Sequence, residues 1–372
     1  RDQHLRLAEG VFKNLTVLQH LNLAGAGLYD VPRQLPAGLQ HIDLNKNKII
    51  SLTQKSFSAI NDVTTIFLSR NCYSGNECNQ TFRAKGTTFS NLTHLETLVL
   101  SYNNISQVPR GLPVSLIELD LAANRIEKIY EDDFSNLVNL KFLRIQGNCP
   151  RCQNAPYPCV PCKLGSIDID PLAFNSLSRL QVLQLAGNSL RTINSSWFEN
   201  LSNLTDLFLS YNFLSEAIAD GSFLMNLHHL KKLDLSYNYD LGVYPENLSL
   251  SQHFSTLVSL HTLHIEGYVF QEIKEHTFRP LQNLTNLSIL NLGVNFIVHS
   301  DSHAFSHLPK LNLLYLSENR LYPVPVNNKS ASNAVVSPYV PVTANYIEEN
   351  EFVYELSHRL IKPECFNTGR VL

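Results

Sequence analysis

The sequence predicts an α/β solenoid, a coil of short parallel strands, because one short pattern recurs along most of its 372 residues. The pattern is clearest in LDLAANRI, residues 119–126. Two leucines one residue apart indicate a strand with one buried face. The Asn carboxamide offers donors and an acceptor to backbone that turns off the strand. This is the L-x-L-x-x-N-x-L pattern of leucine-rich repeats, so we expect a horseshoe with a parallel sheet on its concave face and an irregular or short helical convex side.

The spacing of the Asn position defines about twelve repeats within residues 1–322. Most intervals are 21 to 27 residues long, which is the period of this repeat. The position is occupied in order by Ala26, Asn47, Asn71, Asn103, Asn124, Asn148, Asn188, Asn212, Asn238, Tyr268, Asn295 and Asn319. Twelve strands about 4.8 Å apart predict an inner arc of about 50 to 60 Å. A Phe shortly before a further Leu or Ile also recurs, and we expect it to fill the core at Phe57, Phe89, Phe134, Phe174, Phe198, Phe223, Phe254, Phe278 and Phe305.

Two of the longer intervals contain cysteines. Residues 72–78 form a short loop with Cys at both ends, which one disulfide could close. Residues 149–162 carry two C-x-x-C pairs, a pattern that zinc sites also use. The pairs are six residues apart, whereas a zinc ribbon has about 15 to 20 residues between them. We therefore expect disulfides, with zinc as the alternative, and the expected pairs are Cys72 with Cys78, Cys149 with Cys162, and Cys152 with Cys159.

Asn-x-Ser/Thr sequons are frequent, and their density is typical of a secreted, glycosylated ectodomain in an oxidising compartment. The eleven sequons begin at Asn14, Asn79, Asn91, Asn104, Asn194, Asn200, Asn203, Asn247, Asn283, Asn286 and Asn328. The net charge of −3 argues against a broad basic surface for duplex DNA. No apolar run approaches the roughly 20 residues of a membrane span.

The leucine pattern stops after residue 322. Residues 323–358 are rich in Pro, Asn and Ser, a composition typical of a long exposed loop. Residues 359–372 are expected to begin the next repeat, and Cys365 there is the odd cysteine. No signal peptide heads the sequence. We expect both ends to lie within a longer solenoid.

No catalytic constellation is present: the sequence has no Ser/His/Asp spacing, no Gly-rich phosphate loop and no HExxH. We therefore expect no enzyme and no cofactor. His299, His303 and His307 would share one face if they lay on a helix, and could then bind a metal. They fall among surface positions of a convex segment that need not be helical, so we expect no metal site. The fourteen histidines could instead act as titrating groups in mildly acidic compartments.

The irregular stretches carry a resemblance to a known family. Residues 147–162 read GNCPRCQNAPYPCVPC, residues 267–272 read GYVFQE, residues 295–297 read NFI, and residues 360–363 read LIKP. In these motifs and in the order of its repeats, essentially the whole chain resembles the endosomal, nucleic-acid-sensing Toll-like receptors of the seven, eight and nine group.

The resemblance implies a sensor of single-stranded RNA and its degradation products, uridine-like nucleosides and short oligonucleotides. It implies a homodimer in the lumen of endosomes and lysosomes, as the ectodomain of a single-pass membrane protein that contacts a cytoplasmic adaptor only through an intracellular domain. Residues 323–358 would be the inserted loop that endosomal proteases cut, although this chain lacks a basic cleavage run there. Cys365 would pair with a cysteine in the C-terminal half of the same ectodomain.

The resemblance also implies a nucleoside pocket at the dimer interface. From this chain it would take Tyr237, Tyr239, Gly242, Gly267, Val269, Val294 and Phe296. Tyr237 and Tyr239 could stack on a base, worth about 1 to 3 kcal/mol. Gly267 would leave room for close approach, and Val269 and Phe296 would line an apolar wall. Ordinary packing is the alternative for each aromatic residue, and Tyr268 in the Asn position is compatible with the core. Their clustering on three consecutive strands favours a pocket.

A second site for short RNA is implied on the concave face. His264 matches a family position there and could contact phosphate when protonated. Glu266 stands where a relative carries Arg, which removes a phosphate partner, and Asp234 beside it is also acidic. The main alternative function is a repeat module that recognises a protein through its concave face. A structural scaffold comes third.

Overall fold

The structure is a computed structural model that describes residues 7–73, 76, 78, 81–86, 88–152, 159–240 and 242–321. The expected inserted loop at 323–358, the repeat start at 359–372 and Cys365 lie outside the described residues. So do the sequons at Asn79 and Asn328.

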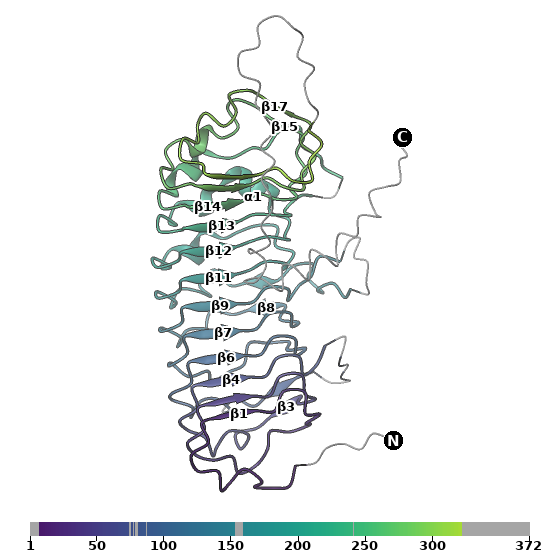
Figure 1. Ribbon diagram of the computed structural model, residues 1–372, viewed down its shortest axis with the longest axis vertical. Coiled ribbons are helices and arrows are strands. Elements are labelled where there is room, and N and C mark those ends of the chain that lie inside the picture. The colour runs from purple at the N-terminus through teal and green to yellow at the C-terminus, as the bar shows by residue number, and fades with distance from the viewer. Residues whose placement is uncertain are drawn as a thin grey trace, which may run out of the picture.

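The predicted solenoid is confirmed, with one strand for each predicted repeat. Twelve parallel three-residue strands pair in chain order into a single sheet (Figure 1). Their bounds are β1 His20–Asn22, β2 His41–Asp43, β4 Thr65–Phe67, β6 Thr97–Val99, β7 Glu118–Asp120, β9 Phe142–Arg144, β11 Val182–Gln184, β12 Asp206–Phe208, β13 Lys232–Asp234, β14 Thr262–His264, β16 Ile289–Asn291 and β18 Leu313–Tyr315.

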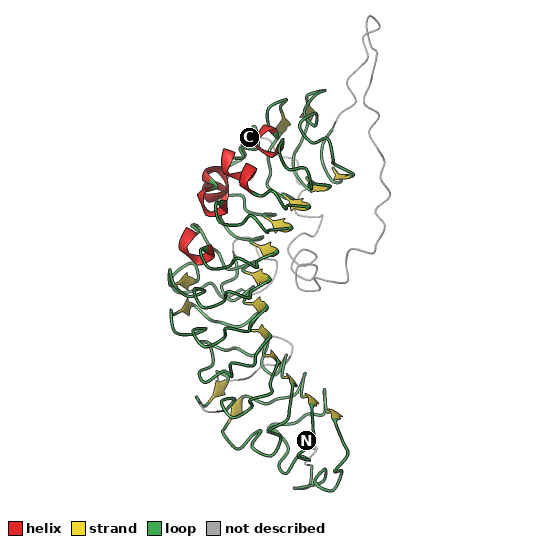
Figure 2. Ribbon diagram, turned by 90° about the vertical axis from the view of Figure 1, so that its left-hand side faces the viewer, coloured by secondary structure: helices red, strands yellow, loops and turns green. Residues whose placement is uncertain are grey.

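The sheet lines the inner side of an arc, and the helices lie on the outer side (Figure 2). The helical segments are short: η1 Ser195–Phe198, α1 Ser215–Asp220, η2 Ser222–Leu224, η3 Gln252–Thr256 and η4 Arg279–Leu281. Three further two-stranded parallel pairs are β3 Ser51–Leu52 with β5 Arg83–Ala84, β8 Lys128–Ile129 with β10 Asp168–Ile169, and β15 Glu272–Ile273 with β17 His299–Ser300.

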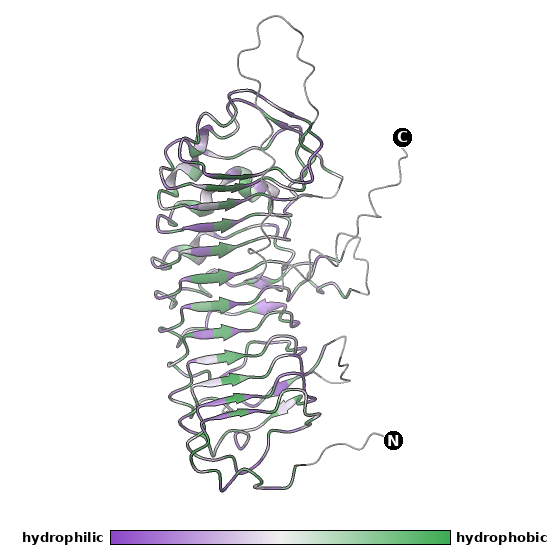
Figure 3. Ribbon diagram, in the orientation of Figure 1, coloured by the Kyte–Doolittle hydropathy of each residue, from purple (hydrophilic) through white to green (hydrophobic). Residues whose placement is uncertain are grey.

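The core is one continuous column between the sheet and the convex side. The central residue of a strand points into it, as Leu119 does, and the residues on either side of that leucine are half-buried on the concave face. Polar and apolar residues accordingly follow one another along the strands (Figure 3). Eight of the nine predicted phenylalanines are buried, whereas Phe305 is half-buried and packs against Phe278 with ring centroids 5.4 Å apart.

The structural asparagines bond across repeats as well as within them. Asn124 is representative: its Nδ2 donates to the carbonyls of Leu121 in its own repeat and Leu100 in the preceding one, at 2.9 and 3.0 Å. Its Oδ1 accepts from the backbone N–H groups of Asn103 and Ile105, at 2.9 and 3.1 Å. Each such side chain therefore fixes the turn of the preceding repeat.

The cysteines of both insertions form disulfides. Cys72 is bonded to Cys78, Cys149 to Cys162, and Cys152 to Cys159, which is the nested arrangement expected. The paired sulfurs offer no thiolate to zinc, so this structure favours disulfides over the zinc alternative.

Candidate functional site

A column of side chains forms where successive strands leave the concave sheet. The residue before the structural Asn position has a positive φ in each repeat of this region: 57° at Tyr211, 56° at Tyr237, 59° at Gly267 and 53° at Val294. The rings of Tyr211 and Tyr237 stack with centroids 4.5 Å apart and planes 9° apart. These positions face one another across consecutive repeats.

Tyr237 is therefore packed within this chain, and its role as a stacking face for a base stays a prediction. The ring of Tyr211 covers one face of the Tyr237 ring, and Tyr237 is only 8% exposed. A Cβ at Gly267 would lie 2.3 Å from Tyr237 Cε1, so the space above Gly267 is filled by this ring rather than left open. Burial raises the pKa of the Tyr237 hydroxyl, which keeps it a hydrogen-bond donor.

Glu266 holds that ring from the concave face. Its Oε1 accepts from the Tyr237 hydroxyl at 2.6 Å, and its Oε2 accepts from Asn291 Nδ2 at 2.9 Å. Burial raises the pKa of the Glu266 carboxyl, while these two donors act in the opposite direction. Glu266 was expected at a second RNA site, but its oxygens are already engaged in positioning Tyr237.

The other two residues of the expected second site lie side by side on β13 and β14. Asp234 and His264 are register partners, and Asp234 is buried with its Oδ1 accepting from the Ser236 N–H at 3.0 Å. Burial lowers the pKa of His264, Lys232 lowers it further, and Asp234 opposes both. Burial thus disfavours the protonated imidazole, and the expected contact of His264 with phosphate stays a prediction.

Because the pKa of Glu266 is raised, the stability of the folded chain should depend on pH. A carboxyl whose pKa is higher in the folded chain than in the unfolded chain takes up a proton on folding, so folding becomes more favourable as the pH falls. From about pH 7.5 to about pH 5, we expect the thermal midpoint of the wild type to rise relative to that of Glu266→Gln. Thermal unfolding across this range measures the difference. The exposed Glu131→Gln variant should run parallel to the wild type, and a Glu266→Gln curve that also ran parallel would contradict the argument.

Tyr239 lies two residues beyond Tyr237 and is half-buried in a different setting. Its ring lies 4.3 Å from the guanidinium carbon of Arg151, and together with Tyr268 it lines a hollow of about 210 Å³. The hollow lies between α1 and the 239–249 loop. Ser215 and Asp240 also line it, and the Ser215 hydroxyl donates to the Asp240 carboxylate.

The remaining predicted pocket residues lie around this loop. Gly242 is exposed with φ +74° and has no side chain or backbone within 4 Å of the place of a Cβ. Val269 is buried beside Tyr268, and its N–H donates to Asn295 Oδ1 at 2.8 Å. Phe296 is half-buried, with Tyr244 at a ring distance of 6.2 Å and the Arg320 guanidinium 4.7 Å from its centroid.

Tyr268 fills the place of the structural Asn and belongs to both the core and the hollow. It is 5% exposed, and its hydroxyl donates to the Ser215 carbonyl at 3.2 Å. Sequence reasoning left this residue open between core and site. Arg151 and Tyr244 were not predicted as site residues, and the only signal for Arg151 was its place between two cysteines.

Comparison with known proteins identifies the family. The family model described as Leucine rich repeat matches residues 167–214 and 258–321. Toll-like receptor 8 of Homo sapiens is 41% identical to this chain, over 99% of the chain and 36% of the receptor. Toll-like receptors 7 and 9 of Mus musculus are 40% and 37% identical, each over 86% of the chain and 31% of the receptor. The chain belongs to the Toll-like receptor family. It spans about a third of the length of these relatives.

The relatives that the chain matches are receptors by name. Within the described residues, no helix has the length and apolar character of a membrane span. The same part of the chain contains no group of three or more His, Cys, Asp or Glu side chains arranged to hold a metal ion. The 302–307 segment is a turn rather than a helix, so His299, His303 and His307 do not share a helical face.

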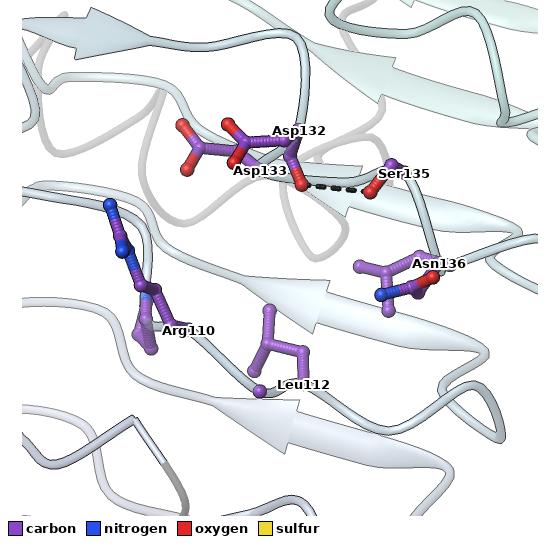
Figure 4. A pocket seen from close by; sticks show the side chains of 9 residues that line it. Arg110, Leu112, Asp132, Asp133, Ser135 and Asn136 are labelled. Atoms are coloured by element: carbon purple, nitrogen blue, oxygen red, sulfur yellow. Dashed lines mark hydrogen bonds between the residues drawn. The ribbon is translucent and has the colours of Figure 1, made fainter.

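A second hollow of about 230 Å³ lies on the convex side of this Toll-like receptor family member, far along the chain from the predicted pocket. Asp132 and Asp133 lie next to one another across from Arg110 (Figure 4). Asp133 Oδ2 accepts from the Tyr130 N–H at 2.8 Å, and burial raises the pKa of this carboxyl. Its main partner is thus local backbone, and we assign the hollow no ligand.

Most sequons in the described residues have an exposed Asn, as expected for an ectodomain. Asn104 and Asn247 are half-buried. Two exposed ones, Asn203 and Asn286, donate from Nδ2 to the carbonyls of Ser178 and Val258 in the preceding repeats, at 2.8 and 2.9 Å. A glycan on either side chain would have to keep or replace that contact.

Proposed function

We propose that this chain is part of the ectodomain of an innate immune receptor that senses single-stranded RNA and its degradation products. Uridine-like nucleosides and short oligonucleotides are the proposed ligands, and the receptor acts as a homodimer in the endosomal and lysosomal lumen. The family relationship to Toll-like receptors 7, 8 and 9 supports the receptor class. The residues around the hollow support the ligand class.

One observation carries the proposal: two aromatic residues line an open hollow, and a third, on the loop that forms the hollow, contacts a fourth on a later repeat. Tyr239 and Tyr268 line the hollow, and Tyr244 from the same loop reaches Phe296. Base stacking on such rings is worth about 1 to 3 kcal/mol per base and needs no basic groove. A planar, uncharged base suits a chain whose net charge is −3.

The size of the hollow supports a site that is shared between two chains. Its volume of about 210 Å³ is below the roughly 300 to 1,000 Å³ of complete small-molecule sites. A nucleoside seated here would keep one side open, and a second copy of the receptor would cover it. Ligand binding and dimerisation would then strengthen each other, because the ligand is buried only in the dimer.

Calorimetry with uridine, on the protein at its full natural length, tests the proposal. We expect Tyr239→Ala and Phe296→Ala each to weaken binding by about tenfold or more, since each removes a stacking face or an apolar wall. Tyr130→Ala is the matched control, because Tyr130 is 45% exposed and lies outside the site. Absence of uridine binding by the wild type, or unchanged affinity in both site variants, would refute the nucleoside assignment.

A further inference from the structure

Arg151 reaches from the cysteine insertion to backbone far along the chain. Its Nη1 donates to the carbonyls of Asn212 and Tyr237, at 3.1 and 3.0 Å, and its Nη2 donates to the carbonyl of Tyr239 at 2.9 Å. The insertion begins at the repeat of Asn148, so this side chain passes the next repeat and joins the two after it. A single guanidinium thereby fixes both ends of the 237–239 segment.

The same guanidinium lies between two rings. Its central carbon is 4.2 Å from the ring centroid of Phe213 and 4.3 Å from that of Tyr239. Arg191 lies over the Phe213 ring as well, at 4.6 Å. Phe213 is buried, so it gives the stack a rigid base. The position of the Tyr239 ring is thus set by both its backbone carbonyl and its face.

Two disulfides hold Arg151 in place. Cys149 is fully buried, and its carbonyl accepts from the Ser189 hydroxyl at 2.8 Å, which ties the base of the insertion to the solenoid. The outer bond joins Cys149 to Cys162, and the inner bond joins Cys152, the neighbour of Arg151, to Cys159. The backbone on both sides of Arg151 is therefore cross-linked.

The clamped segment is the one that lacks support from the asparagine column. In a regular repeat, the Asn of the following repeat accepts from one or two backbone N–H groups, as Asn238 does from Leu214 and Asn124 does from Asn103 and Ile105. For the repeat of Asn238, the following residue at that position is Tyr268, which has no carboxamide to accept those bonds. Arg151 donates instead to the Tyr237 and Tyr239 carbonyls of the same turn.

We propose that the cysteine insertion is a clamp for the nucleoside site and that Arg151 is its positioning residue, holding the Tyr239 ring and the 237–239 backbone where a base stacks. This inference rests on the proposed function for its ligand. The clamp itself is a property of the fold. Arginine suits the role because its planar fork can donate to several carbonyls while its faces stay against two rings, whereas the ammonium of lysine has one centre and no face.

The test compares Arg151→Lys with Arg191→Lys in the full-length protein. Both changes keep the charge, and both side chains lie against Phe213, but Arg191 is exposed. Hydrogen exchange supplies a readout that does not depend on ligand, at the Tyr237 N–H, which donates to the Glu266 carbonyl at 2.7 Å. Uridine affinity from calorimetry supplies the second.

For Arg151→Lys we expect faster exchange over residues 237–240, unchanged exchange over residues 118–145, and about tenfold weaker uridine binding. Arg191→Lys should leave both readouts within about twofold of the wild type. Unchanged exchange over 237–240 would overturn the clamp. Faster exchange with unchanged affinity would overturn the positioning role.

If Arg151→Lys does not fold, the double variant Cys152→Ser with Cys159→Ser replaces it, because this variant retains the outer disulfide and removes only the inner one. Local loosening over 237–240 supports the clamp, and its absence overturns it. A wild type that fails to bind uridine, combined with faster exchange in either variant, would refute the proposed ligand and leave the clamp standing.

Discussion

Gly267→Ala is expected to destabilise the protein by about 2 to 5 kcal/mol and to abolish nucleoside binding. The backbone at Gly267 has φ +59°, where a side chain costs about 1 to 2 kcal/mol. The new Cβ would also lie 2.3 Å from Tyr237 Cε1 and 2.4 Å from its Cδ1. Tyr237 cannot move away easily, because Tyr211 is stacked on it and Glu266 holds its hydroxyl. Denaturant unfolding and uridine calorimetry measure the two effects.

Gly25→Ala separates the clash from the backbone strain. Gly25 has φ +69° with no atom within 4 Å of the place of its Cβ, and it lies in the first repeats, away from the site. This variant should lose only the strain cost of about 1 to 2 kcal/mol and should bind uridine as the wild type does. Equal losses of stability in the two variants would show that contact with Tyr237 contributes nothing.

The solenoid could be predicted from sequence because nearly every repeat carries the same pattern of leucines and asparagine. Leu119, Leu121 and Asn124 illustrate them: two inward side chains on a strand, then one carboxamide that turns the chain. Twelve copies of a weak signal make a strong one, and a solenoid needs no long-range information beyond stacking of neighbours. The disulfides were predictable for a similar reason, since short loops with Cys at both ends leave few pairings.

The site was predicted less well because neighbouring residues of the same type have different surroundings. Tyr237 and Tyr239 are two positions apart, but Tyr237 is packed between Tyr211 and Gly267 while Tyr239 lines the hollow. One available signal was that Tyr211 occupies the same repeat position as Tyr237, which predicts a stack across repeats. Arg151 gave no such signal, because its partners are 61 to 88 residues away and one irregular loop brings it there.

The irregular features of this solenoid coincide. The turn that lacks its Asn partner is followed by the loop that forms the hollow, and the clamp from the cysteine insertion reaches the same turn. In a regular repeat the asparagine column supplies hydrogen-bond partners to the backbone of the turn, and successive turns have the same conformation. Where the pattern breaks, at Tyr268, backbone groups and ring faces become available for another use. Departures from the repeat are therefore better guides to the site than any motif within it.

The asparagine column itself can be tested at a regular repeat. Asn124→Ala is expected to lower the free energy of unfolding by about 3 to 5 kcal/mol, among the largest effects of any single substitution in this chain. The change removes the acceptor of two interior N–H groups, those of Asn103 and Ile105. The Leu100 and Leu121 carbonyls each lose one donor and keep another, from Asn103 and Asn148. Each buried N–H group left without an acceptor costs about 1 to 3 kcal/mol, and relaxation of the turn recovers part of the sum. Urea unfolding followed by circular dichroism measures the loss.

Asn136→Ala is the matched control, because Asn136 is an exposed asparagine later in the same repeat, between β7 and β9. It should change the free energy of unfolding by no more than about 0.5 kcal/mol. If Asn124→Ala cost no more than this control, hydrogen bonding by the column would not hold the repeats together, and stacking of the leucine core alone would. The same result would remove the reason for a clamp at Tyr268, since a turn that never depended on a carboxamide has no need of Arg151 when the carboxamide is absent.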